Sequence, residues 1–465
     1  AGGAAAAEAR WITSGAVAEI PSPTHADLAR AEPFGFALAL ENGTLAVLSP
    51  WGRKAWAFER QEDGIWSSAP AAAALTYPQD ASVFALYDRV AMGGTGVVAG
   101  GELNEALATS ASAEEHSAWF ARGQTALLFP WEPGGPWGAP VVLNGPANRA
   151  GFGIAVAISG DVAIVSAKNS GMYFYSATEG GVAAIYERTG GVWSSEPSAV
   201  VDGYSAFGGF GRLLAVDGPG GVALVGSTLA GAVHVFERSG GAWSSTASAV
   251  MALDALPVGE PEASTLAVSG GYAVVGAPSL NRVRIYERLS QSSWALAAEL
   301  PGPSTAGALF GCSVDVDDLG GGRAAVVVGA RGERRALLFE RSATTGSWGP
   351  ALELLAAGGG AAANPQGFGR SVGVSGDTVA VGSDAKKVYV YTEQLTGVAP
   401  ATPAGAFAGP PPRHRLGLDA RLLQAGVQHT LCLDLDGDGP DEAFKDVGLR
   451  LALARHGRLR HAEEL

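Results

Sequence analysis

The chain has 465 residues, of which only 16% are charged, and it carries a formal net charge of −14. An acidic chain without runs of Lys and Arg argues against nucleic acid as a partner, because phosphates are bound by clustered basic side chains. No run of about 18 large apolar residues is present, so no transmembrane segment is expected. A hydrophobic fraction of 47% excludes a disordered chain despite 67 glycines and 26 prolines.

The first residues, Ala1 to Ala7, are small and do not include an initiator Met. This pattern is typical of a chain from which a targeting peptide has been removed. We therefore expect a secreted or cell-surface protein, or one in an organelle lumen.

One unit recurs along residues 34 to 397. It begins with Phe-Gly, continues through two hydrophobic stretches joined by a turn such as Ser-Gly-Asp, and adds a third stretch that ends in an aromatic residue. Seven residues hold this aromatic position: Phe58, Phe129, Tyr186, Phe236, Tyr286, Phe339 and Tyr391. The stretches are short, β-branched and bounded by Gly, Asn or Pro, which predicts strands. Their spacing predicts an all-β, seven-bladed β-propeller at residues 1–397.

The tryptophans predict how the ring closes. Six units have a Trp shortly after the aromatic strand, namely Trp66, Trp137, Trp193, Trp243, Trp294 and Trp348. The seventh unit lacks one, whereas Trp11 begins a similar segment at the other end of the chain. We expect residues 11–20 to supply the outer strand of the last blade, so that the ring has no free edge.

The residues Phe368 to Gly382, which read FGRSVGVSGDTVAVG, carry a family pattern. Together with aromatic-Glu-Arg and Gly-Gly-x-Trp, this pattern resembles FG-GAP repeat proteins, whose repeats also build the seven-bladed propeller of integrin α subunits. The resemblance covers about residues 11 to 397. It implies a propeller used for adhesion, ligand binding or scaffolding, usually outside the cell, and it does not imply a reaction.

Many FG-GAP blades hold calcium in an Asp-x-Asp/Asn-x-Asp-Gly loop. The nearest blade equivalent begins at Asp317, and it has Leu319 and Gly321 at positions that need oxygen ligands. We therefore expect blades without calcium.

A candidate calcium loop lies beyond the repeats, in a C-terminal extension at 413–465 that follows a Pro-rich linker at 398–412. Its ligands would be Asp434, Asp436, Asp438, the carbonyl of Pro440, and Glu442. The flanking residues alternate as in a β-hairpin. A plain acidic turn is the alternative. No other cofactor is expected.

Two insertions between strands offer candidate binding surfaces. The insertion of the second unit contains Trp119 and Phe120, and that of the third contains Met172, Tyr173, Phe174 and Tyr175. Exposed aromatic clusters suit interface hot spots. These rings could instead fold back over their own blade.

No catalytic residues are predicted. No Gly-x-Ser-x-Gly elbow precedes a helix, Cys312 occupies a variable position after Phe-Gly, and His234 stands where other units have unrelated residues. Whether Cys312 pairs with Cys432 stays open.

These observations favour a non-catalytic scaffold, an adhesion-type or structural subunit that binds other protein subunits and is not an enzyme. The alternative is a carbohydrate-active, lyase-type enzyme with a site in the central channel or at the tail loop. A glycan-binding module is a further alternative, with Trp51 and Trp56 as candidate stacking residues.

Overall fold

The structure is a computed structural model of the chain. The residues that it describes are 9–11, 18–21, 34–35, 37–41, 43–49, 54–61, 65–67, 75–76, 89–93, 95–100, 126–131, 137–146, 152–167, 181–203, 209–227, 231–252, 265–303, 305, 307–356, 364–384, 387–395, 428–433, 445–453 and 459–461. The chain divides into two compact units, Ala1–Val398 and Ala399–Leu465.

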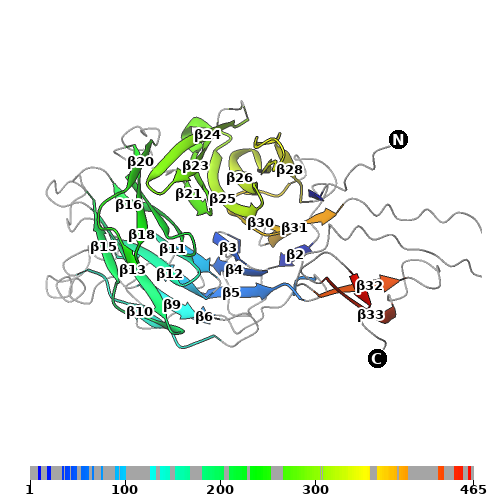
Figure 1. The fold of residues 1–465 in the computed structure, drawn as a ribbon. Helices are drawn as coiled ribbons and strands as arrows, with labels where there is room; N and C mark the ends of the chain where they lie inside the picture. Colours follow the sequence, from blue (N-terminus) through cyan, green and yellow to red (C-terminus); the bar gives the residue numbers. More distant parts are fainter. Residues whose placement is uncertain are drawn as a thin grey trace, which may run out of the picture. The chain divides into compact units, whose positions relative to one another are not determined.

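The first unit consists of seven small antiparallel sheets arranged as a seven-bladed β-propeller (Figure 1). Blades 1 to 3 contain β3 (Ala37–Glu41), β4 (Thr44–Ser49), β5 (Lys54–Glu59) and β6 (Leu75–Thr76); β7 (Arg89–Gly93), β8 (Gly96–Gly100), β9 (Ala126–Pro130) and β10 (Val141–Leu143); and β11 (Val156–Ser159), β12 (Val162–Ala167), β13 (Val182–Thr189), β14 (Val192–Trp193) and β15 (Ala199–Asp202).

Blades 4 to 6 follow the same order from the inner to the outer strand. They contain β16 (Phe210–Asp217), β17 (Val222–Ser227), β18 (Ala232–Ser239), β19 (Ala242–Trp243) and β20 (Ala249–Ala252); β21 (Thr265–Ser269), β22 (Tyr272–Ala277), η1 (Pro278–Leu280), β23 (Arg282–Ser290) and β24 (Ser293–Pro301); and β25 (Phe310–Gly320), β26 (Arg323–Ala330), η2 (Arg331–Glu333), β27 (Arg335–Arg341) and β28 (Leu352–Leu354).

Blade 7 joins the two ends of the repeat region. Its own strands are β29 (Val372–Ser375), β30 (Thr378–Gly382) and β31 (Lys387–Leu395), and β31 pairs with two N-terminal strands, β1 (Ala9–Trp11) and β2 (Ala18–Pro21). The predicted propeller and its N-terminal closure are therefore confirmed. Closure uses two strands instead of the one expected: β1 pairs with the end of β31 around Glu393, and β2 pairs with its beginning around Tyr389.

Apolar side chains fill the seams between blades. Among the described residues, each seam has its own buried cluster. The Phe of Phe-Gly lies in these clusters with its ring edge-on to the aromatic residue of the third strand, as in the pairs Phe34–Phe58 and Phe310–Phe339. Both positions of the repeat are therefore aromatic because they pack on each other.

The Gly of Phe-Gly has a separate role. Gly35, Gly153, Gly211, Gly311 and Gly369 all have φ between 82° and 100°, a left-handed conformation that favours glycine. The carbonyl groups of four of these glycines accept hydrogen bonds from hydroxyls of the preceding blade: Ser166 to Gly211 (2.5 Å), Thr265 to Gly311 (2.8 Å), Ser313 to Gly369 (3.0 Å) and Ser371 to Gly35 (2.8 Å). The repeat thus links each of these blades to the next.

The second unit contains a three-stranded antiparallel sheet of β32 (Gln428–Leu433), β33 (Lys445–Leu453) and β34 (Leu459–His461). This agrees with the expected hairpin-like extension. The linker at 398–412 and the acidic loop from Asp434 to Glu442 lie outside the described residues.

Candidate functional site in the central channel

The inner strands of the seven blades surround a cavity of about 1060 Å³. Aliphatic side chains of these strands, among them Leu38, Val156, Leu214 and Val372, line the channel wall. Turn residues and carboxylates line the end at which the inner strands meet their hairpins. The acids at the cavity are Glu41, Asp217, Asp315, Asp317, Asp318 and Asp377.

Several of these carboxylates bind the hairpin of a neighbouring blade. Asp217 of blade 4 accepts a hydrogen bond from the backbone N–H of Gly270 in blade 5 (2.8 Å). Asp317 of blade 6 accepts one from Gly376 in blade 7 (2.7 Å) and one from the Ser269 hydroxyl in blade 5 (3.2 Å). These acids therefore hold adjacent hairpins together besides facing the cavity.

Arg60 is the only basic side chain among the described residues that line the cavity. Its Nη1 lies 2.6 Å from Asp377 Oδ1 and 3.3 Å from the Thr378 hydroxyl, both in blade 7. The cavity therefore has a marked excess of acceptors and negative charge over donors.

Asp315, on β25, occupies an unusual position. The strand registers align it with Ala39, Ala91, Ala157, Ala215, Ala267 and Gly373 of the other blades. Small residues fit there because the next blade is close: a Cβ on Gly373 would lie 3.0 Å from the Cβ of Leu40. Blade 6 thus places a carboxyl group where the other six place at most a methyl group.

The surroundings of Asp315 favour its protonated form. Burial raises the pKa of its carboxyl from 3.8 to about 7, and the charges of Asp317 and Glu41 act in the same direction. The backbone N–H groups of Val374 (2.8 Å) and Val316 oppose this shift by donating to the carboxylate. Asp315 therefore changes protonation state near neutral pH.

The structure does not describe the residues expected to bind partners or calcium. The aromatic residues of the two insertions, Trp119, Phe120, Met172, Tyr173, Phe174 and Tyr175, lie outside the described residues, as do the candidate calcium ligands Asp434, Asp436, Asp438, Pro440 and Glu442. Among the described residues, no group of three or more His, Cys, Asp and Glu side chains has the arrangement of a metal site.

The prediction that Trp56 stacks on a glycan is wrong. Trp56 is only 2% exposed and packs on Phe34 with ring centroids 5.7 Å apart, so it cannot stack on a sugar. Trp51 lies outside the described residues. His234 is half-buried against Phe210, and Cys312 is half-buried with its Sγ 3.5 Å from the Gly369 carbonyl oxygen.

Sequence reasoning missed Asp315. The signal was present in the sequence. When the seven units are aligned on the aromatic residue of their third strand, the inner-strand position of Asp315 holds Ala or Gly in the other six units. The prediction of functional residues instead concentrated on Phe-Gly and on the turns.

A search of the described residues finds no helix whose length and hydrophobicity would let it span a membrane.

No protein-family model matches the sequence, and no curated protein matches it. Solved structures are similar in fold. A periplasmic gluconolactonase from Pseudomonas aeruginosa is 14% identical over 69% of this chain and 85% of its own, with a TM-score of 0.42. A catalytically inactive virginiamycin B lyase from Staphylococcus aureus, with quinupristin, is 9% identical over 80% and 98%, with a TM-score of 0.43. Hydrazine synthase of Kuenenia stuttgartiensis is 12% identical over 80% and 98%, with a TM-score of 0.47.

These structures correct the expectation that the chain is not an enzyme. That expectation was inferred from the propeller fold, which was taken to imply a binding role. The inference is wrong, because solved structures of similar fold include a gluconolactonase and a lyase. At these identities the likeness concerns the fold alone, and the case for a function depends on the channel.

Proposed function

We propose that the chain is a carbohydrate-active enzyme of the lyase or hydrolase type, which binds a small hydroxyl-rich molecule in the central channel. The observation that carries this proposal is the carboxyl group of Asp315 at the channel cavity, in a position that the other six blades fill with Ala or Gly. In this proposal Asp315 exchanges a proton with the bound molecule.

The chemistry of the cavity supports a hydroxyl-rich ligand. A cavity of about 1060 Å³ is large enough for a small molecule, since ligand sites typically measure roughly 300–1,000 Å³. Carboxylates such as Asp317 and Asp377 can accept hydrogen bonds from sugar hydroxyls, and Arg60 can donate to a ring or carbonyl oxygen. The aliphatic wall can pack on the C–H faces of the ring.

The protonation of Asp315 supports acid–base catalysis. A general acid or base is most effective when its pKa lies near the working pH, and burial raises the pKa of Asp315 to about 7. The same group can therefore donate and accept a proton at neutral pH.

The test is turnover of a panel of oligosaccharides, amino sugars and sugar lactones, with products detected by mass spectrometry. We expect turnover to be abolished in Asp315→Ala, which restores the residue of the other blades, and in Asp315→Asn. Asp161→Asn is the matched control, because Asp161 does not line the cavity and its side chain is 61% exposed. Turnover that persists in Asp315→Ala, or a panel without any substrate, would contradict the proposal.

Three other expectations stay predictions: kinship with FG-GAP proteins, calcium in the C-terminal loop, and a location outside the cytosol. The first is supported by the buried Phe and left-handed Gly that each Phe-Gly supplies.

A further inference from the structure

A second carboxyl group, that of Asp317, lies two residues after Asp315 on the inner strand of blade 6. The strand β25 pairs with β26 without a register shift from Ser313 to Asp318. Successive side chains of a strand point to opposite faces, so residues two positions apart share a face. Asp315 and Asp317 therefore lie on the same face of β25, and both line the cavity.

The next blade holds both carboxyl groups in place. Asp315 accepts a hydrogen bond from the N–H of Val374 (2.8 Å), and Asp317 accepts one from the N–H of Gly376 (2.7 Å). These two N–H groups are also two residues apart, so the carboxyl groups follow the spacing of the backbone. A strand rises about 3.3 Å per residue, which places the two carboxyl groups roughly 6.5–7 Å apart.

The two carboxyl groups have different surroundings. Burial favours the protonated form of Asp315. Asp317 accepts from Gly376 with one oxygen and from the hydroxyl of Ser269 with the other (3.2 Å). Both oxygens of Asp317 are therefore acceptors, which suits an ionised carboxylate. The pair thus offers one proton donor and one proton acceptor to the same cavity.

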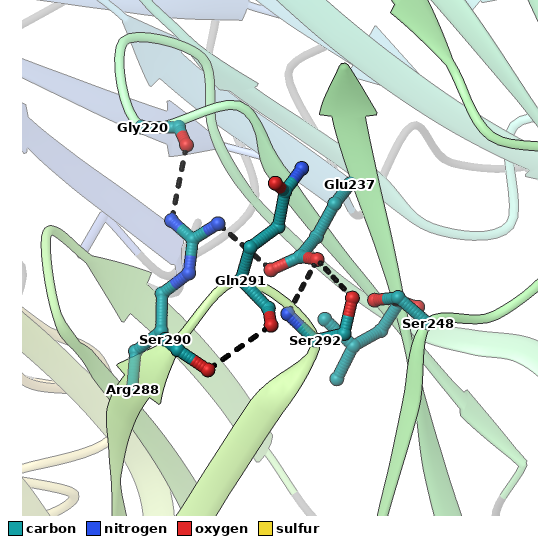
Figure 2. A network of polar contacts seen from close by, with 8 residues as sticks. Gly220, Glu237, Ser248, Arg288, Ser290, Gln291 and Ser292 are labelled. Atoms are coloured by element: carbon teal, nitrogen blue, oxygen red, sulfur yellow. Dashed lines mark hydrogen bonds and ion pairs between the residues drawn. The ribbon is translucent and has the colours of Figure 1, made fainter.

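A carboxylate with a purely structural role looks different in this ring (Figure 2). Glu237 is only 3% exposed, and it accepts hydrogen bonds from Arg288 (2.7 Å) and from the N–H (2.8 Å) and hydroxyl (3.2 Å) of Ser292. Arg288 also donates to the carbonyl oxygen of Gly220 (3.3 Å). An arginine thus compensates the charge of Glu237. Asp317, in contrast, is partly exposed at the cavity, and the two hydrogen bonds named above come from neutral donors.

Blade 4 contains the structural counterpart of Asp317. The strand registers align Asp317 with Asp217, which accepts a hydrogen bond from the N–H of Gly270 in blade 5 (2.8 Å). The residue two positions before Asp217 is Ala215, whereas in blade 6 it is Asp315. An acid at this position therefore has a structural use in the ring, and blade 6 alone adds a second acid on the same face of the strand.

We propose that Asp317 is the general base and Asp315 the general acid of a glycoside hydrolase that inverts the configuration of the anomeric carbon. This inference rests on the proposed function and narrows it to the hydrolysis of a glycosidic bond. In inverting enzymes the two carboxyl groups are roughly 6.5–9.5 Å apart, which leaves space for a water molecule, and in retaining enzymes they are only about 5–5.5 Å apart. The spacing of two strand residues matches the inverting arrangement.

The proposed step moves one proton at each carboxyl group. The proton of Asp315 passes to the glycosidic oxygen as the bond between that oxygen and the anomeric carbon breaks. Asp317 removes a proton from a water molecule, whose oxygen bonds to the anomeric carbon from the opposite face. Asp317 then holds the proton that Asp315 has lost, and exchange with solvent restores both groups.

Proton NMR of the first product released from an oligosaccharide of the panel tests this mechanism on the intact chain. We expect the new reducing end to appear first as the anomer opposite to that of the cleaved bond. A retained anomer, an unsaturated elimination product, or turnover of lactones alone would overturn the inference. In each of these cases turnover that depends on Asp315 would still support the proposed function, whereas a panel without any substrate contradicts both.

A pair of variants separates catalysis from structure. Asp317→Asn and Asp217→Asn each weaken one contact between neighbouring blades, so a purely structural role predicts similar effects of the two. We expect Asp317→Asn to lower kcat by roughly 10²–10⁴-fold, the usual contribution of a general base, and at least tenfold more than Asp217→Asn. Circular dichroism checks that both variants are folded. Equal losses of kcat would overturn the role of Asp317.

Azide provides a readout that a structural role would not change. Azide attacks the anomeric carbon without losing a proton, so it needs no general base. We expect azide to restore turnover in Asp317→Ala and to give a glycosyl azide of inverted configuration, detected by mass spectrometry and NMR. A folded Asp317→Ala variant that azide does not reactivate would contradict the proposal. If Asp317→Ala does not fold, the anomer released by the unaltered chain still decides.

Discussion

At the residue scale, the protein shows how one substitution within a repeat creates a distinct chemical group. The inner strands present Ala or Gly to the next blade in six blades, and the seventh presents Asp315. Its neighbours are fixed by the repeat itself, so burial and the nearby Asp317 and Glu41 raise its pKa to about 7. The repeat thus supplies the environment that perturbs the acid.

This pKa predicts how stability depends on pH. Between about pH 4 and pH 7 the folded chain keeps a proton on Asp315 that the unfolded chain releases, so this residue lowers the free energy of unfolding as pH rises. Asp315→Asn should therefore raise the free energy of unfolding by up to a few kcal/mol at about pH 8, and change it little at about pH 4. Urea denaturation at both pH values measures this. Equal effects at the two pH values would contradict it.

At the element scale, the Phe-Gly step sets the geometry of the inner strand in the five blades that have it. Gly369 has a φ of 82°, and a Cβ there would lie 2.0 Å from the backbone carbonyl oxygen of Arg335. The glycine therefore allows blade 7 to approach blade 6 so closely that the Ser313 hydroxyl reaches the Gly369 carbonyl.

Gly369→Ala should therefore be costly. Strain in the left-handed region costs about 1–3 kcal/mol, and the clash with backbone atoms adds to it. Gly376→Ala is the matched control, since Gly376 has a φ of 57° but nothing lies within 4 Å of the position that a methyl group would take there. Chemical denaturation should give a larger loss for Gly369→Ala than for Gly376→Ala. Equal losses would show that close packing at Phe-Gly does not matter.

At the scale of the whole molecule, the ring is a chain of seven seams with different connections. The seam between blades 7 and 1 combines a large apolar cluster, the Arg60–Asp377 pair and the Ser371–Gly35 hydrogen bond. The closing seam is consequently well connected, and the chain itself also passes from blade 7 to blade 1, because β2 of blade 7 is followed by β3 of blade 1.

Removing residues 1–21 tests the closure. Without β1 and β2, the strand β31 is left with an unpaired edge, and Ile20 no longer fills its fully buried place between blades 7 and 1. We expect a lower midpoint of thermal unfolding and concentration-dependent association through the free edge. Calorimetry and size-exclusion chromatography measure the two effects. A truncated chain that melts like the full chain and stays monomeric would contradict this account.

The repeated residues by themselves determined the propeller, its seven blades and its N-terminal closure, because strand periodicity, turn residues and the aromatic positions are local patterns. The tertiary structure decided which residues meet. Arg60 and Asp377 are far apart along the chain, Trp56 is buried instead of exposed, and Asp315 faces the backbone of Val374 in another blade. Such contacts depend on how seven sheets pack around one channel, and packing between distant segments leaves no local pattern in the chain.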